Sequence, residues 1–151
     1  MRLRIDSIER NLDNLYSAIS SVDDDEVKAH LSKYFCVRIS GYVENTVKIL
    51  LNSYVERSSP KSVSAFVQHE LKNLTNLTDD KLKKILKCFN DDWESSIDID
   101  LTEQQRSSLN SVISNRNNIA HGQPDSISFK LIGQYYADLK DITKKLQEII
   151  R

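Results

Sequence analysis

Residues that break helices are scarce in this chain, which has three glycines and two prolines among its 151 residues. Tight hairpin turns depend on glycine, and proline cannot continue a helix or a central strand. The sequence therefore favours long helices over a sheet. The longest apolar pattern at helical spacing runs from about Glu26 to about Arg57. A helix of that length spans roughly 45 Å at about 1.5 Å per residue, the full length of a small domain.

Caps and periodicity place the other predicted helices. The T-x-x-Q pattern of Thr102 to Gln105 is a capping box, and Gly122 followed by Pro124 ends the helix that it starts at about His121. The stretch DDWESSIDID, residues 91–100, is irregular and is predicted to be a loop or a partly ordered segment. The prediction is an all-α bundle of about five or six helices in a single domain, 1–151, with the further helices at about 2–20, 60–73, 78–90 and 126–150.

Composition narrows the class of protein. Hydrophobic residues make up 39% and charged residues 28% of the chain, and its net charge is −1. These values are typical of a globular domain and give no overall basic field for nucleic acid. No long apolar run or signal-like segment is present, and the two cysteines fit reduced thiols, so we expect a cytoplasmic protein with no membrane contact. No metal-ligand spacing or glycine-rich nucleotide motif occurs, so no metal or cofactor is predicted.

The segment SNRNNIAHG, residues 114–122, raises the main functional question. On a helical wheel with Leu109 at 0°, Arg116 lies at about 340°, in the middle of an apolar stripe. Asn117 and His121 lie together at the edge of this stripe. Burying an unpaired charge costs several kcal/mol. Either an acid such as Glu44 or Asp125 pairs with Arg116, or this end of the stripe faces a groove for anions or a second subunit.

The long helix repeats this anomaly. Arg38 falls inside its apolar arc, with Asn45 close by, whereas Glu44 points away from Arg38. Gly41 lies beside them and would let another helix approach closely. Two arginines on two apolar stripes predict a polar seam between these helices, in which Arg38 and Asn45 either support the site or touch a substrate.

These residues resemble a known signature. RNNIAH, Arg116 to His121, is similar to the R-x4-6-H motif of the HEPN superfamily (higher eukaryotes and prokaryotes nucleotide-binding). The stretch VRISGYVENTVKILL on the long helix resembles the RiboL-PSP-HEPN branch, which carries a similar R-x-S-G-x-x-E pattern. Together with the helical layout, the resemblance covers about residues 25–150.

The resemblance implies a HEPN-like helical bundle and a metal-independent endoribonuclease. In such families two R-x4-6-H motifs meet across a twofold axis, so a homodimer with a composite active site is expected. Members commonly act as toxins or antiphage defence effectors, restrained by a cognate antitoxin or sensor protein. Other members have lost activity and bind only nucleotide or protein, and this alternative stays open.

The residue types suit cleavage of RNA, the expected substrate. His121 can act as base or acid, since imidazole titrates near neutral pH. Arg116 can bind phosphate oxygens bidentately, and Asn117 can orient the imidazole or a phosphate oxygen, so these three residues are the predicted catalytic set. Arg38, Glu44 and Asn45 are candidates for a supporting or substrate-binding role.

Simpler interpretations compete with each of these roles. His121 can merely cap helix carbonyls, and the whole chain can be a structural helical adaptor. The run KLKKILK, residues 81–87, is either a solvated basic face or a track for RNA.

Overall fold

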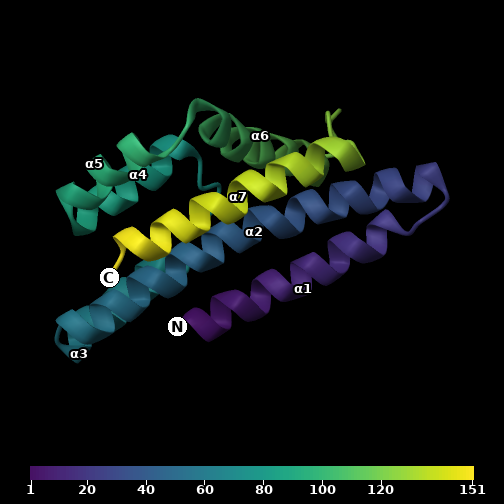
Figure 1. Ribbon diagram of the computed structural model, residues 1–151. Coiled ribbons are helices and arrows are strands. Elements are labelled where there is room, and N and C mark those ends of the chain that lie inside the picture. Colours follow the sequence, from purple (N-terminus) through teal and green to yellow (C-terminus); the bar gives the residue numbers. More distant parts are fainter.

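The computed structural model describes residues 1–151 as seven helices and confirms the all-α prediction (Figure 1). The helix predicted to be longest is indeed the longest, at 34 residues. The helices in chain order are α1 (Arg2–Ser20), α2 (Asp25–Ser58), α3 (Lys61–Leu71), α4 (Asp79–Phe89), α5 (Asp91–Asp100), α6 (Glu103–Ala120) and α7 (Phe129–Ile149).

Helix α2 is the centre of the bundle, and α1, α3, α6 and α7 all pack against it (Figure 1). It starts where the side chain of Asp24 accepts a hydrogen bond from the Val27 N–H, 2.9 Å away. It ends before Pro60, because proline forces the preceding residue, Ser59, into an extended conformation (φ −137°, ψ 156°).

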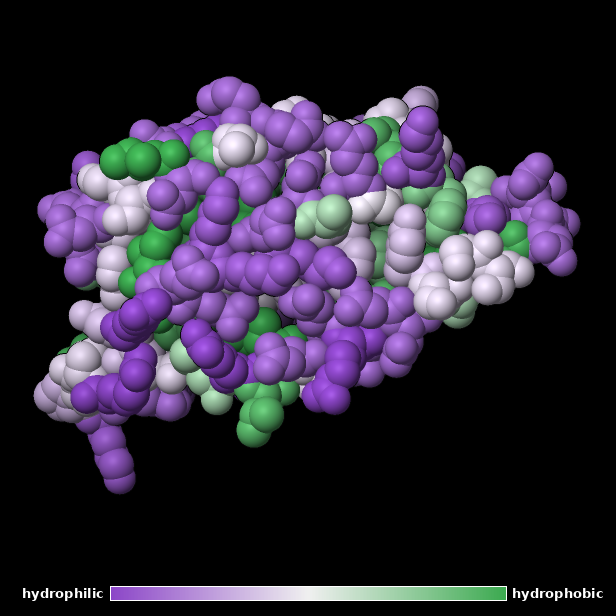
Figure 2. Space-filling view, in the orientation of Figure 1, coloured by the Kyte–Doolittle hydropathy of each residue, from purple (hydrophilic) through white to green (hydrophobic).

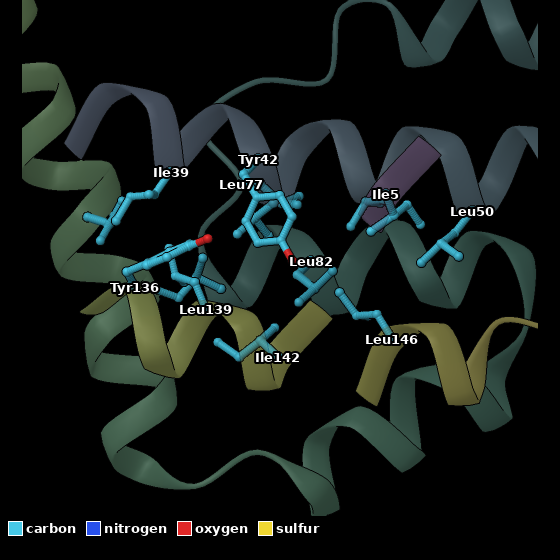
Figure 3. Close-up of a cluster of buried hydrophobic side chains, with 14 of the residues drawn as sticks. Ile5, Ile39, Tyr42, Leu50, Leu77, Leu82, Tyr136, Leu139, Ile142 and Leu146 are labelled. Carbon is cyan, nitrogen blue, oxygen red and sulfur yellow. The ribbon is translucent and has the colours of Figure 1, made fainter. Parts of the chain in front are cut away.

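Aromatic and aliphatic side chains of α2 and α7 form the middle of a core of 27 buried residues (Figure 3). Phe35 and Tyr136 meet edge to face, with their ring centroids 5.1 Å apart. The buried Tyr42 hydroxyl bonds to Thr143 Oγ1 at 2.7 Å and donates to Glu9 Oε2 at 2.9 Å. Burial raises the pKa of Tyr42, so this hydroxyl stays neutral and its hydrogen bonds join α1, α2 and α7.

Residues 91–100 form helix α5, so the predicted loop there is wrong. The side chain of Asn90 caps this helix by accepting a hydrogen bond from the Asp92 N–H at 2.7 Å. Trp93 and Ile97, four residues apart, are both buried on one face. The helix is only ten residues long; half of these are acidic, and only two of its three apolar residues lie on the buried face, so its periodicity is too weak to recognise.

The other helix ends agree with the sequence to within a few residues. The capping box at Thr102 and Gln105 is present, and Gly122 adopts the left-handed φ of 64° that ends α6. Helix α7 starts at Phe129, three residues later than predicted, because the Ser128 side chain caps it. None of the helices is long and apolar enough to cross a membrane. Figure 2 shows mainly hydrophilic residues on the visible face, with scattered apolar ones.

A cluster of charges holds α4, α5 and α6 together. The carboxylate of Asp79 is almost fully buried and accepts two hydrogen bonds, both 2.9 Å long, from Arg106 Nη1. Lys83 Nζ lies 3.1 Å from the same carboxylate and 3.2 Å from Asp98. Since a buried carboxylate without partners is costly, Arg106 is a structural residue of this fold.

We expect Arg106→Leu to lower the free energy of unfolding by about 3 kcal/mol, because the buried Asp79 carboxylate loses its main partner. Urea denaturation followed by circular dichroism measures this loss. Glu103→Ala on the same helix is the control, since its carboxylate is exposed and 3.8 Å from Arg106; it should change stability by less than about 0.5 kcal/mol. Equal effects of the two substitutions would contradict this role of Arg106.

Candidate functional site

Arg116 lies one turn before the end of α6, half-buried, and no acidic side chain forms an ion pair with it. Its Nη1 donates to two amide oxygens, Oδ1 of Asn76 at 3.1 Å and Oδ1 of Asn117 at 3.0 Å. A direct ion pair with Glu44 or Asp125, one of the two alternatives for Arg116, is therefore absent. The guanidinium is hydrogen-bonded to neutral groups, so no carboxylate neutralises its charge.

Asn76 connects Arg116 to Glu44. The Asn76 N–H donates to Glu44 Oε1 at 2.7 Å, while its side chain accepts from Arg116. Its φ of 53° is left-handed, a conformation that asparagine tolerates better than most residues. Asn76 was not predicted from the sequence, since its only signal is an asparagine in the short polar segment between α3 and α4. We call Glu44, Asn76, Arg116 and Asn117 the arginine network.

The arginine network leaves part of the guanidinium free. An arginine has five N–H donors, and the two on Nη1 are used by Asn76 and Asn117. The Nε–H and the two donors on Nη2 therefore have no partner within the chain. Such a pre-oriented fork with unused donors suits the oxygens of a phosphate group.

His121 is the residue at which α6 ends, and its side chain is exposed. The helix closes with a Schellman motif, in which the Gly122 N–H donates to Ile119 O at 3.3 Å and the Gln123 N–H to Asn118 O at 2.8 Å. The imidazole itself makes no hydrogen bond within the chain, so backbone groups and not the ring cap these carbonyls. The ring nitrogens are available to a ligand.

The segment after His121 is anchored on both sides. The buried Asn115 accepts hydrogen bonds through Oδ1 from the Ser126 N–H at 2.9 Å and from Ser126 Oγ at 3.3 Å. Asp125 forms an ion pair with Lys33 of α2 at 2.9 Å. Burial alone would raise the pKa of Asp125, but hydrogen bonds from Lys33 and the Ile127 N–H, with the lysine charge, hold it below its ordinary value. These contacts fix where the chain leaves the helix that carries His121.

Arg38 and Asn45 do not join the arginine network. Both are exposed and line a hollow between α1 and α2 together with Asn11. Arg38 donates to the Tyr34 hydroxyl at 2.7 Å and covers its ring. The predicted seam between Arg38 and Arg116 is therefore wrong, because the buried face of α2 is centred on residues such as Phe35, Ile39 and Val43 and excludes the arc that holds Tyr34 and Arg38.

Two further predictions have a structural outcome. The expected close approach of a helix at Gly41 is wrong, because a Cβ atom built there would meet nothing within 4 Å. The lysines of residues 81–87 have different roles: Lys83 belongs to the buried ion cluster, and Lys81 donates to the Thr75 carbonyl, while Lys84 and Lys87 are exposed.

No group of three or more His, Cys, Asp or Glu side chains is close enough together to hold a metal ion.

The pairing of an unneutralised arginine with an exposed histidine at one helix end is the arrangement expected for the R-x4-6-H motif. A family model for RiboL-PSP-HEPN matches residues 3–151, almost the whole chain. The chain belongs to the RiboL-PSP-HEPN family. No curated protein and no solved structure matches it. As a HEPN domain, the chain falls in a class whose candidate activities are RNA cleavage and nucleotide binding.

The depressed pKa of Asp125 predicts an acid-dependent loss of stability in this HEPN domain. The unfolded chain binds a proton at the ordinary value near 3.8, above the folded value, so the ion pair stabilises fully above pH 3.8 and is lost as the pH falls below it. Asp125→Asn should remove this part of the acid dependence. Urea denaturation between pH 7 and pH 3 tests it, with the exposed Asp23→Asn as control. An unchanged acid dependence in Asp125→Asn would contradict the assignment.

Proposed function

We propose that this HEPN domain is an endoribonuclease in which Arg116 and His121 promote attack of an RNA 2′-hydroxyl on the adjacent phosphate. The observation that carries the proposal is the guanidinium of Arg116, which is fixed by two amides and left without an acidic partner, at the helix end that also carries the free imidazole of His121. Arg106 on the same helix, by contrast, pairs with the buried Asp79 carboxylate and stabilises the fold.

The chemistry follows from the substrate. RNA carries its own nucleophile, so neither a metal-activated water nor a covalent side chain is needed. A neutral imidazole takes the proton of the 2′-hydroxyl, the 2′-oxygen bonds to phosphorus, and the bond to the 5′-oxygen of the next nucleotide breaks. That leaving oxygen takes up a proton from a protonated imidazole. The products are a 2′,3′-cyclic phosphate and a 5′-hydroxyl end.

Arg116 stabilises the negative charge that develops on the phosphate oxygens. Its unused Nε and Nη2 donors lie in one plane and are oriented before substrate binds, so little reorganisation is needed during the reaction. Asn117 holds the fork in this orientation through its Oδ1 and is a positioning residue. Glu44 acts indirectly, because it fixes Asn76 in the conformation that accepts a hydrogen bond from Arg116.

One copy of the chain supplies a single histidine at this helix end, whereas the reaction needs a base and an acid. We therefore propose a homodimer whose two α6 ends form one composite cleft with two His121 and two Arg116 side chains. The exposure of His121 in the single chain is consistent with such a cleft. A toxin or antiphage defence role, with an antitoxin or sensor that restrains the enzyme, accords with this activity and with the family.

The second candidate is a catalytically silent HEPN domain that binds nucleotide or protein. It is favoured by the fact that no protein group hydrogen-bonds to the His121 ring, so nothing in the single chain fixes its orientation for proton transfer. Binding of RNA without cleavage would support this candidate.

We expect His121→Ala to lower the rate of RNA cleavage at least about a hundredfold, the usual contribution of a general acid–base group. The exposed imidazole makes no hydrogen bonds, so the free energy of unfolding should stay within about 0.5 kcal/mol of wild type. His69→Ala, an exposed histidine on α3, is the matched control and should cleave normally. Gel analysis of a labelled single-stranded RNA provides the measurement.

A mixing experiment separates a composite cleft from one built within a single chain. Wild-type chains refolded with an excess of His121→Ala chains should lose activity roughly as the square of the wild-type fraction, because a mixed dimer holds one histidine and lacks either the base or the acid. Activity in proportion to the wild-type fraction would refute the composite cleft, and full cleavage by His121→Ala alone would refute the proposed mechanism.

A further inference from the structure

A basic groove runs between α1 and α2, on the side of α2 that the bundle leaves open. It consists of two adjoining hollows of about 280 and 600 Å³ that share Ile8 and Asn45 in their walls and reach as far as α3. We call it the α1–α2 groove. Its cations come from three places in the sequence, namely Arg4 of α1, Arg38 and Lys48 of α2, and Lys72 after α3.

The cations of the groove are not neutralised. None of the four forms an ion pair, and the hydrogen bonds that Arg38 and Lys48 make go to neutral oxygens, the Tyr34 hydroxyl and the Lys72 carbonyl. The one acid in the walls, Glu56, is exposed and accepts from Gln68. Four such charges in a concave surface stand out in a chain whose net charge is −1. A concave basic surface attracts a polyanion.

The walls of the groove also carry side-chain amides, which can bind chemical groups other than phosphate. Asn45 is exposed, and Asn52 has a buried Oδ1 without any hydrogen-bond donor. An amide group offers an acceptor oxygen as well as N–H donors, so a ligand that carries N–H donors can bond to it. Amino groups on the edges of nucleobases are such donors when the bases are unpaired.

An aromatic side chain stands at the Arg38 end of the groove. The Tyr34 ring is 47% exposed, and the guanidinium of Arg38 lies 5.6 Å from its centroid. An exposed ring beside a cation is the stacking platform that proteins use for single-stranded bases.

The floor of the groove has no side chain at Gly41. A glycine inside a helix is less favourable than alanine, yet a Cβ atom at Gly41 would meet nothing within 4 Å. No contact within the chain therefore requires this glycine. A ligand that lies directly on the α2 backbone would require it.

The groove adjoins the arginine network. Lys48, in its wall, lies one helical turn after Glu44 on α2 and donates to the Lys72 carbonyl, while Glu44 accepts from the Asn76 N–H a few residues further along the same segment. The wall from Arg38 to Asn52 covers 14 helical steps, or roughly 20 Å at about 1.5 Å per residue, which is room for several nucleotides.

We infer that the α1–α2 groove binds single-stranded RNA next to the bond that is cleaved, with the four cations on phosphates and the asparagine amides on base edges. This inference rests on the proposed ribonuclease function. A duplex does not fit the role, because its paired bases cannot reach Asn45 and Asn52 and its base faces are not free to stack on Tyr34.

The test uses a fluorescent 2′-O-methyl RNA of mixed sequence, which cannot be cleaved because its 2′-oxygen is blocked. Fluorescence anisotropy of the full chain at about 50 and 200 mM salt gives its dissociation constant. The double substitution Arg4→Gln/Lys48→Gln should raise that constant about tenfold and make the logarithmic salt dependence shallower by about 1–2. Lys84→Gln/Lys87→Gln, with the same charge change on exposed α4 positions, should raise it less than about threefold.

Each outcome decides something specific. Equal weakening by the two double substitutions, or none by the groove pair in a folded protein, overturns the groove assignment. Tighter binding of a duplex or of an acidic peptide than of the single strand also overturns it. Because the probe is uncleavable, groove-dependent binding together with normal cleavage by His121→Ala would refute only the proposed catalytic residues.

Discussion

The burial of one long face of α2 is the constraint on which the rest of this structure depends. Most of the stability of a helix in a protein comes from the packing of its apolar face, and α1, α3, α6 and α7 pack against α2 through residues such as Phe35, Ile39 and Val43. These four helices do not surround α2 completely. The uncovered strip of α2 is where its polar residues gather, and Glu44 lies at the border between the strip and the core.

This arrangement explains how a charged side chain can be fixed and still be available. Arg116 is oriented by the amide oxygens of Asn76 and Asn117, and Glu44 acts on it only through Asn76. A direct ion pair would fix the guanidinium equally well but would neutralise it and use the donors that a phosphate needs. The contrast within α6 is clear, because Arg106 binds the buried Asp79 carboxylate and serves stability alone.

Much of this was predictable from the sequence, because the local signals agree with one another. The class of fold followed from the scarcity of glycine and proline. The capping box at Thr102 and the glycine after His121 predicted the helix that carries the motif, and the family match confirms the resemblance. The motif RNNIAH itself placed Arg116, Asn117 and His121 on one helix end. Their roles in catalysis stay a prediction.

What the sequence did not reveal depends on contacts between distant segments. Asn76 reaches Arg116 across 40 positions, and its left-handed backbone has no strong sequence signal. The helical wheel put Arg38 in an apolar arc, but only packing decides which arc of a long helix is covered, and here Tyr34 and Arg38 face solvent. Helix α5 depends on the burial of Trp93 and Ile97, and two buried positions in an acidic segment are too weak a pattern to predict a helix.

The most direct test of the account is the chemistry of the RNA ends left by the purified protein in excess chelator. Mass spectrometry of a cleaved oligonucleotide should show a 2′,3′-cyclic phosphate and a 5′-hydroxyl, and a single 2′-deoxy substitution at the cleaved position should abolish the cut, because the 2′-oxygen is the nucleophile. A 5′-phosphate end, or undiminished cleavage at the 2′-deoxy position, would contradict the central claim that Arg116 and His121 act on an attack by the RNA itself.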